Sequence, residues 1–250
     1  MKKILTAVLV ALCAGCTRAD SRYYAIDHFY FQEEGDAFRE AFAEASIQLY
    51  EWYQSIEGED GVYILHSEHY TDDLLALWRN NHIYEPVPEK GYWYFAVSEN
   101  YLRERGFALS PQESEAIRSG VRLYLLPDTL SQDEQNTMEA HLRTVAVYGL
   151  NGSPMIETSF ESDPRVACRT YHFEGTFETE EDGEIANPVV YVCSSENMKY
   201  FESESLIATG KRDSYIKLTK EAFEKYVQNG FPQELKDRQI TFLPLSQIRN

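Results

Sequence analysis

The chain has 250 residues, of which 43% are hydrophobic and 14% aromatic, and its formal net charge at pH 7 is −18. This apolar content is sufficient for a hydrophobic core, so the composition excludes a disordered chain. The acidic charge excludes nucleic acid as a partner and disfavours anionic lipid headgroups, because like charges repel. Two uses of the acidity stay open: solubility of an exported protein, which we favour, and attraction of a cationic peptide.

The first sixteen residues have the pattern of an export signal. Lys2 and Lys3 form a basic head, residues 4–12 form an apolar run, and small residues precede Cys16. The run has roughly half of the apolar residues that a membrane-spanning helix needs. The pattern therefore predicts a cleaved signal peptide over residues 1–15, and an uncleaved anchor is the alternative.

The residues around the predicted cleavage point also resemble the lipobox of bacterial lipoproteins. In that motif, cleavage falls before a cysteine whose sulfur carries a diacylglycerol, which implies lipidation of Cys16. Cys13 departs from the motif, in which Leu is usual at this position. We expect a mature chain that begins at Cys16, continues through a tether over residues 16–22 and lies on the extracytoplasmic face of the cell membrane.

Beyond the tether, runs of aromatic and β-branched residues alternate with segments of helical periodicity. The runs predict strands over residues 22–31, 61–65, 92–97, 121–126, 165–173, 189–193, 206–210, 215–218 and 240–245. The periodic segments predict helices over residues 37–54, 72–78, 111–119, 131–145 and 220–228, with a single turn at 197–201. The residues expected to cap helices are Asp36, Thr71, Ser110 before Pro111, and Thr219.

This order of elements predicts an α+β fold with a mixed sheet and helices packed on one face. Residues 23–150 alternate strands and helices, whereas residues 151–250 are richer in strands. Two small domains and one continuous domain both stay open. The acidic run at residues 178–184 predicts a solvated loop.

Cys168 and Cys193 are the two cysteines outside the signal region, and each lies in a predicted strand. In an oxidising compartment they are disulfide candidates, and a bridge would add about 3–4 kcal/mol of stability on the loop-entropy model. The alternative is a pair of independent buried thiols. Residue types and spacing do not decide between the two.

His66 and His69 are the only close pair of histidines, at the point where the second predicted strand gives way to a loop. They are candidates for a zinc site, but a His-x-x-His spacing supplies neither a third ligand nor the His-Glu-x-x-His pattern of metalloproteases. Solvated loop histidines are the simpler interpretation. Residues 210–212 read Gly-Lys-Arg and lack the remaining residues of a phosphate loop, so a turn is predicted there. We predict no catalytic residue and no cofactor.

Two predicted strands are rich in aromatic residues, at positions 23–30 and 92–94. Such strands line a groove for a peptide or glycan in some proteins, and pack in the core beneath a helix in others. We favour the core, because alternate side chains of a strand point to opposite faces of the sheet.

Five short phrases resemble the extracytoplasmic domain of bacteriocin-associated seven-span membrane proteins. They lie at residues 97–102, 122–127, 188–199, 205–210 and 215–218. These membrane proteins are similar to the permease subunits of MacB/FtsX-like ABC transporters. The resemblance implies a role in export of antimicrobial peptides or in immunity to them, with an ABC transporter permease as partner. It carries no catalytic residue to this chain.

The chain departs from that family in beginning with a predicted lipobox and in ending at Asn250, where such a permease would enter its second span. It is expected to be either a free-standing lipoprotein version of the domain or a fragment of a longer protein. The expected function is that of a lipid-anchored, extracytoplasmic binding or accessory protein, not an enzyme, beside an ABC-type exporter. The alternatives are an exported hydrolase with metal chemistry at His66 and His69, and a structural envelope lipoprotein.

Overall fold

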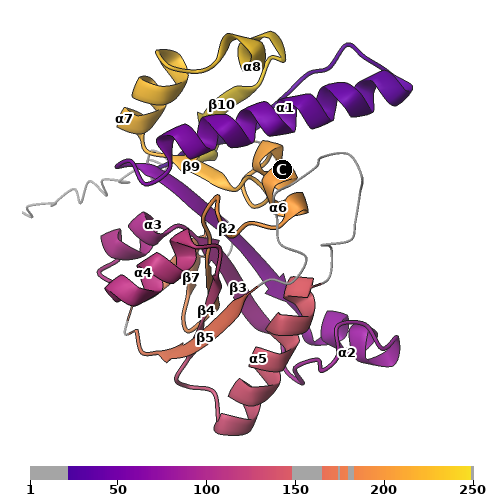
Figure 1. The fold of residues 1–250 in the computed structure, drawn as a ribbon, viewed down its shortest axis with the longest axis vertical. Coiled ribbons are helices and arrows are strands. Elements are labelled where there is room, and N and C mark those ends of the chain that lie inside the picture. The colour runs from indigo at the N-terminus through magenta and orange to yellow at the C-terminus, as the bar shows by residue number, and fades with distance from the viewer. Residues whose placement is uncertain (1–21, 148–164, 174, 180–182, 249–250) are drawn as a thin grey trace, which may run out of the picture.

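A mixed β-sheet of eight strands forms the centre of the protein (Figure 1). The computed structural model describes residues 22–147, 165–173, 175–179 and 183–248. The strands of this sheet are β1 (Tyr24–His28), β2 (Val62–Tyr70), β3 (Tyr92–Val97), β4 (Arg122–Pro127), β5 (Val166–Tyr171), β8 (Val189–Val192), β9 (Ile216–Leu218) and β10 (Thr241–Pro244). They lie in the order β10-β1-β9-β2-β3-β8-β4-β5, and the pairs β3–β8 and β4–β5 are parallel.

The strand order joins the two parts of the chain in one sheet. β9 lies between β1 and β2, and β8 lies between β3 and β4, so strands from the second part are inserted among strands from the first. Val62 of β2, for example, lies opposite Leu218 of β9. Residues 23–150 and 151–250 therefore share a sheet, as in the one-domain alternative.

Helices cover both faces of the sheet (Figure 1). One face carries α1 (Gly35–Ile56), α5 (Gln132–Val147), α6 (Tyr200–Glu204), α7 (Lys220–Ala222) and α8 (Gln233–Asp237), with α2 (Asp72–Asn80) beside the far end of β2. The other face carries α3 (Glu99–Glu104), α4 (Pro111–Arg118) and a hairpin of β6 (Phe177–Thr179) and β7 (Gly183–Ile185). The α+β class with a mixed sheet is as predicted.

The prediction that helices pack on one face only was wrong. Successive residues of β2 belong alternately to two hydrophobic clusters: Val62 and Ile64 face α1, whereas Tyr63 and Leu65 face α3. All four are buried. A sheet whose strands are apolar on both sides must be covered on both sides, because exposed apolar surface is costly in water.

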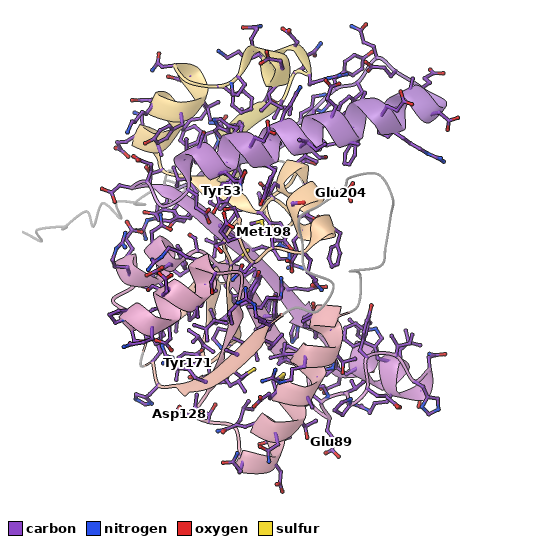
Figure 2. All side chains as sticks on the ribbon, viewed as in Figure 1. Tyr53, Glu89, Asp128, Tyr171, Met198 and Glu204 are labelled. Atoms are coloured by element: carbon purple, nitrogen blue, oxygen red, sulfur yellow. The ribbon has the colours of Figure 1, made fainter. Side chains whose placement is uncertain are left out.

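Side chains from distant parts of the chain fill the two layers between helices and sheet (Figure 2). Tyr53 of α1 and Met198 lie in the layer beneath α1, each with 1% of its surface exposed. Tyr171 of β5 belongs to the opposite layer, and its hydroxyl donates a hydrogen bond to the carbonyl oxygen of Pro188, 2.7 Å away. Two separate cores therefore sandwich the sheet.

Three of the four predicted capping residues are confirmed, whereas the prediction for Asp36 was wrong, because Glu34 is the N-cap residue of α1 and Asp36 lies in its first turn. The hydroxyl of Thr71 accepts a hydrogen bond from the backbone N–H of Leu74, and that of Thr219 from Ala222. Ser110 forms a capping box with Glu113, and Pro111 occupies the first turn of α4. These contacts satisfy N–H groups that a helix start leaves without partners, so they depend on local sequence alone.

Three predicted elements differ from the structure. Residues 178–179 and 183–184 of the predicted solvated loop belong to β6 and β7, in which Phe177 and Ile185 pair and are buried in the core, whereas residues 180–182 lie outside the described residues. The strand predicted at 206–210 is a 3-10 turn at Ser205–Ile207. The helix predicted at 220–228 continues beyond Ala222 as a π-helix, Phe223–Gln228. In each case tertiary packing outweighs the local pattern.

Candidate functional site

The predicted lipidation residue, Cys16, lies outside the described residues. Cys168 and Cys193 are both free thiols, so the disulfide alternative is not realised. β5, which carries Cys168, and β8, which Cys193 directly follows, lie on opposite sides of β4. Their Cα atoms are thus at least two strand spacings apart, about 9–10 Å, beyond the reach of a disulfide. Burial raises the pKa of both thiols, that of Cys168 to about 12.

His66 and His69 are separated by the sheet itself. Both lie inside β2, which continues to Tyr70, so the loop predicted at this point is absent. Residues three apart in a strand point to opposite faces. His66 stacks on Tyr215 at 4.3 Å between ring centroids, and His69 stacks on Trp93 at 4.5 Å. The two imidazoles do not face a common ion, and the described residues contain no group of three or more potential ligands placed around a metal.

The aromatic residues of β1 and β3 pack mainly within the protein. Tyr24 stacks on Phe223 at 4.3 Å, and Tyr94 lies over Tyr191 at 6.5 Å. Tyr23 is 6% exposed and meets Tyr63 edge-on. These contacts give the aromatic strands the core role that their alternation favours.

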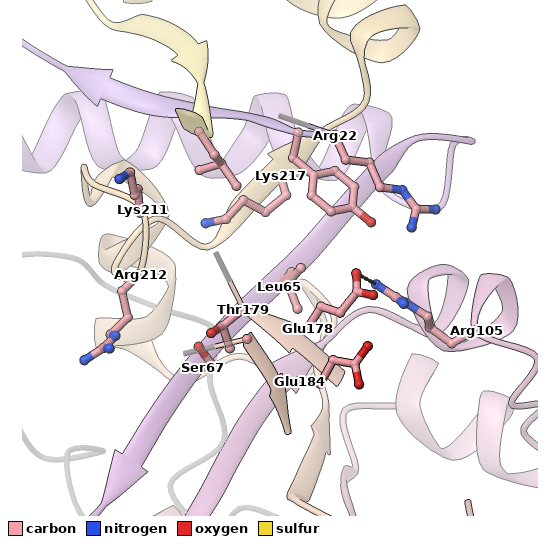
Figure 3. A pocket seen from close by; sticks show the side chains of 13 residues that line it. Arg22, Leu65, Ser67, Arg105, Glu178, Thr179, Glu184, Lys211, Arg212 and Lys217 are labelled. Carbon is pink, nitrogen blue, oxygen red and sulfur yellow. Dashed lines mark hydrogen bonds and ion pairs between the residues drawn. The ribbon is translucent and has the colours of Figure 1, made fainter. Parts of the chain in front are cut away.

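A cavity of 370 Å³ opens on the sheet face that carries α3 and the β6–β7 hairpin (Figure 3). The described residues of its lining include more basic than acidic side chains, and we call the cavity the basic cleft. The charged residues that line it are Arg22, Arg105, Lys211, Arg212, Lys217, Glu178 and Glu184. Among the described residues of the lining, positive charges thus exceed negative ones, in a chain whose net charge is −18.

Strand alternation places Lys217 in the basic cleft. Its neighbours Ile216 and Leu218 are 0% exposed and point into the core beneath α1, so the side chain of Lys217 points to the opposite face. It is 3% exposed, and its ammonium group donates a hydrogen bond to the carbonyl oxygen of Ser214. A positive charge at the wall of a cavity attracts anions.

A glycine turn brings Lys211 and Arg212 to the same cavity. Gly210 has a φ of +104°, a backbone conformation that side chains with a Cβ rarely adopt. Its N–H donates to the carbonyl oxygen of Ile26 at 3.1 Å, which holds the turn against β1. The two basic residues that follow therefore lie at the rim of the cleft.

Arg105 and Glu178 border the cleft on its other side. Arg105 follows α3, and its guanidinium donates to the Glu178 carboxylate at 3.3 Å. The same guanidinium lies 5.2 Å from the ring centroid of Tyr101. Burial raises the pKa of the nearby Tyr23 hydroxyl, although Arg22 and Arg105 oppose the shift. Tyr23 is therefore a neutral phenol at pH 7.

A different arrangement of charges lies buried on the opposite sheet face. The guanidinium of Arg122 donates to both carboxylate oxygens of Glu202 at 2.8 Å, and the two side chains are 2% and 8% exposed. Arg122 also donates to the carbonyl oxygen of Asn197 at 2.7 Å and stacks over Tyr191 at 4.1 Å. Burial favours the neutral acid, but Arg122 outweighs it and lowers the pKa of Glu202. This cluster is satisfied internally.

A second cavity, of 390 Å³, lies between the start of α1 and α8, and we call it the acidic groove. Glu33, Glu44, Glu234 and Asp237 line it, with Arg238 as its one basic residue among those described. Arg238 pairs with Glu33 at 2.8 Å and with Glu44 at 3.3 Å. Tyr30, 47% exposed, lies beside these acids.

The residues of the basic cleft were not identified from the sequence as a site. The sequence pattern correctly predicts a turn at residues 210–212, but it predicts no binding role for Lys211 or Arg212. A signal does exist: apart from Lys2-Lys3, this is the only pair of adjacent basic residues in the chain. Lys217 carried no such signal, because its burial depends on β9 lying between β1 and β2.

Comparison with known protein families, curated protein sequences and solved structures found no match for this chain. The described residues include no helix with the length and apolar character needed to cross a membrane. Function therefore has to be argued from the cavities, the charges around them and the pattern of the sequence.

Proposed function

We propose that this protein is a binding protein whose basic cleft takes the anionic group of a small ligand. One observation carries the proposal: among the described residues that line a 370 Å³ cavity, basic side chains outnumber acidic ones, although the whole chain is strongly acidic. The volume is within the usual range for small-molecule sites, about 300–1,000 Å³. The surrounding negative charge would keep anions away from most of the surface, so the cleft is the place where one can be held.

The chemistry of the lining supports a carboxylate or a similar compact anion. Hydrogen bonds between charged partners contribute about 1.5–3 kcal/mol each when partly shielded from water. Ser67, which is 7% exposed, and Thr179 add hydroxyl groups, and Leu65 adds apolar surface. A ligand with an acid group and a short uncharged body matches these features.

A pair of peptides tests the proposal. N-acetyl-trialanine and its C-terminal amide differ only in whether a carboxylate is present. We expect isothermal titration calorimetry to give at least about tenfold tighter binding for the acid, and Lys217→Met to remove most of that preference. Lys220→Met, at an exposed lysine on α7, is the matched control and should bind like the unmodified protein. Equal binding of acid and amide would contradict the proposal.

The cellular setting that we propose is the outer face of a membrane, with Cys16 lipidated and an ABC-type exporter as partner. The leader pattern of residues 1–16 supports the anchor, and the resemblance to bacteriocin-associated membrane proteins supports the partner and a role in antimicrobial-peptide export or immunity. Crosslinking in native membranes, followed by mass spectrometry of the tagged protein, tests both. Recovery of an unlipidated protein without a permease or an ATPase would count against this setting.

A cationic peptide is a second candidate ligand, and the acidic groove is the observation that favours it. Glu234 and Asp237 are exposed there beside Tyr30, whose ring offers a stacking surface for a cationic side chain. N-acetyl-trilysine amide should bind this groove, and Glu234→Gln together with raised salt should weaken binding. Binding that is indifferent to salt would count against the groove.

A further inference from the structure

The charges of the basic cleft are divided between its two sides. Lys211 and Arg212 lie on one side, and Glu178, Glu184 and Arg105 lie on the other (Figure 3). Leu65, Ser67 and Thr179 lie between them in the same view. The cleft therefore has a side with only basic charges, a middle in which Lys217 is the charged residue, and a side where Glu178 and Glu184 lie with Arg22 and Arg105.

One charge on each side lacks an internal partner. Glu178 is paired with Arg105 at 3.3 Å. Across the residues that the structure describes, neither Lys211 nor Glu184 takes part in an ion pair. Unpaired charges of opposite sign across one cavity define a dipolar site, since each attracts the group that the other repels.

We infer that the ligand of the basic cleft is a zwitterion, an α-amino acid or a short peptide with free termini. Its carboxylate lies toward Lys211 and its ammonium group toward Glu184. This inference rests on the proposed function and narrows it, because it adds a requirement for a positive group. The middle of the cleft, with the hydroxyls of Ser67 and Thr179, lies where the polar backbone of such a ligand would run.

The carboxylates on the acidic side of the cleft disfavour binding of ligands that carry only negative charge. A dicarboxylate or a phosphate ester long enough to reach Glu184 would place a second anion beside an unpaired carboxylate, and such like-charge contacts reduce affinity. A zwitterion of the same length gains an ion pair there. The site would therefore select ligands by the charge of the group that reaches Glu184, in addition to the anion near Lys211.

The test compares three forms of one peptide: trialanine, N-acetyl-trialanine and trialanine amide. In calorimetric titrations at low salt, we expect trialanine to bind about tenfold more tightly than either blocked form. Glu184→Gln should abolish the preference over the acetylated form while keeping the preference over the amide. Lys211→Gln should do the reverse.

Two exposed positions away from the cleft supply the matched controls. Glu51→Gln on α1 and Lys236→Gln on α8 make the same chemical changes and should leave both preferences intact. Circular dichroism of each variant confirms that it is folded. A series of alanine, dialanine and trialanine then identifies the ligand length that spans the site.

The outcomes separate this inference from the proposed function. If N-acetyl-trialanine binds as well as trialanine and better than the amide, the inference of a zwitterionic ligand is wrong and the proposed anion-binding function is retained. If trialanine and its amide bind equally, both are wrong. Failure of all three peptides to bind also overturns both. Loss of the preference in Glu51→Gln would overturn the assignment to Glu184.

Discussion

The two faces of the sheet use the same kinds of charged residue in opposite ways. On the face beneath α1, Arg122 and Glu202 are buried and give each other two hydrogen bonds of 2.8 Å. On the other face, Lys211 and Glu184 line a cavity without an internal ion pair among the described residues. The first arrangement satisfies its charges within the protein. In the second, the charges border a cavity, where we propose that a ligand binds.

The two arrangements differ in whether a charged side chain has partners within the protein or borders a cavity, and this difference separates charges that stabilise the fold from candidates for ligand binding. A buried charge with a complete set of partners contributes to stability only as part of its pair, and breaking the pair is costly. A charge beside a cavity contributes little to folding, so its presence there is better explained by what it binds. Exposure alone does not separate the two, because Lys217 in the cleft is 3% exposed and Arg122 is 2% exposed.

The largest expected effect comes from breaking the buried pair. Glu202→Gln leaves the Arg122 guanidinium buried without a counter-charge, and we expect the free energy of unfolding to fall by about 3–5 kcal/mol. Urea denaturation followed by circular dichroism measures this loss. Glu115→Gln is the control, because its pair with Arg118 is exposed at 73% and 61% and is expected to contribute less than about 1 kcal/mol. Equal losses of unfolding free energy in the two variants would contradict the view that the buried pair contributes more to stability than an exposed pair.

The next effect is a pH dependence from a buried histidine on the same face as Arg122. The Nδ1 atom of His141 lies 3.0 Å from the carbonyl oxygens of Tyr84 and Pro86, and its Nε2 atom has no hydrogen-bond partner in the described structure. Burial lowers the pKa of His141 below its ordinary 6.5. The neutral form is thus the one that the fold stabilises, and this stability is present above pH 6.5 and is lost as the pH falls below it.

His141→Phe removes this titration. The stability difference between the unmodified protein and this variant should narrow as the pH falls from 7 to 5, by at most about 1.4 kcal/mol per pH unit. Urea unfolding at several pH values measures it, with His28→Gln at an exposed histidine as the control. A difference that widened on acidification would mean that the folded state prefers the charged ring.

Lys217→Met tests whether a buried charge of the cleft behaves differently from the buried pair. We expect its free energy of unfolding to fall by less than that of Glu202→Gln, because the side-chain volume is kept and the ammonium group, which donates to Ser214, borders a cavity. Its affinity for N-acetyl-trialanine should nevertheless fall about tenfold. A loss of stability as large as that of Glu202→Gln would mean that Lys217 serves mainly to stabilise the fold.

The smallest expected effect is that of salt. The cleft is open to solvent, so raising the ionic strength from 0.1 M, where the Debye length is about 10 Å, to 1 M, where it is about 3 Å, should weaken binding of N-acetyl-trialanine severalfold. The buried pair of Arg122 and Glu202 is screened much less. Calorimetry at both ionic strengths measures the change in affinity. Urea unfolding of Glu202→Gln at the same two ionic strengths shows whether the stability contribution of the buried pair changes less.

Some features follow from short stretches of sequence. Thr71, Ser110 with Pro111, and Thr219 cap helices where the pattern predicts, and β3 has the predicted bounds. A capping hydroxyl reaches an N–H only three residues away, so its effect is local. The turn at Gly210 was predictable for the same reason, but the ligand chemistry of Lys211 beside it was not.

Other features depend on which strands become neighbours. The separation of Cys168 from Cys193 follows from β4 lying between β5 and β8, and that of His66 from His69 follows from β2 extending to Tyr70. Strand bounds and order depend on contacts between residues far apart in the chain, which periodicity does not encode.

The sequence by itself determined the acidic charge, the export pattern, the α+β class and the helix caps at Thr71, Ser110 and Thr219, because these depend on composition and on residues a few positions apart. Only the tertiary structure decided that helices cover both faces, that Arg122 meets Glu202, and that Lys211, Lys217 and Glu184 border one cavity. The physical reason is that a cavity and its charges arise where separate segments pack together, and the sign of a local field is set by that packing and not by the net charge of the chain.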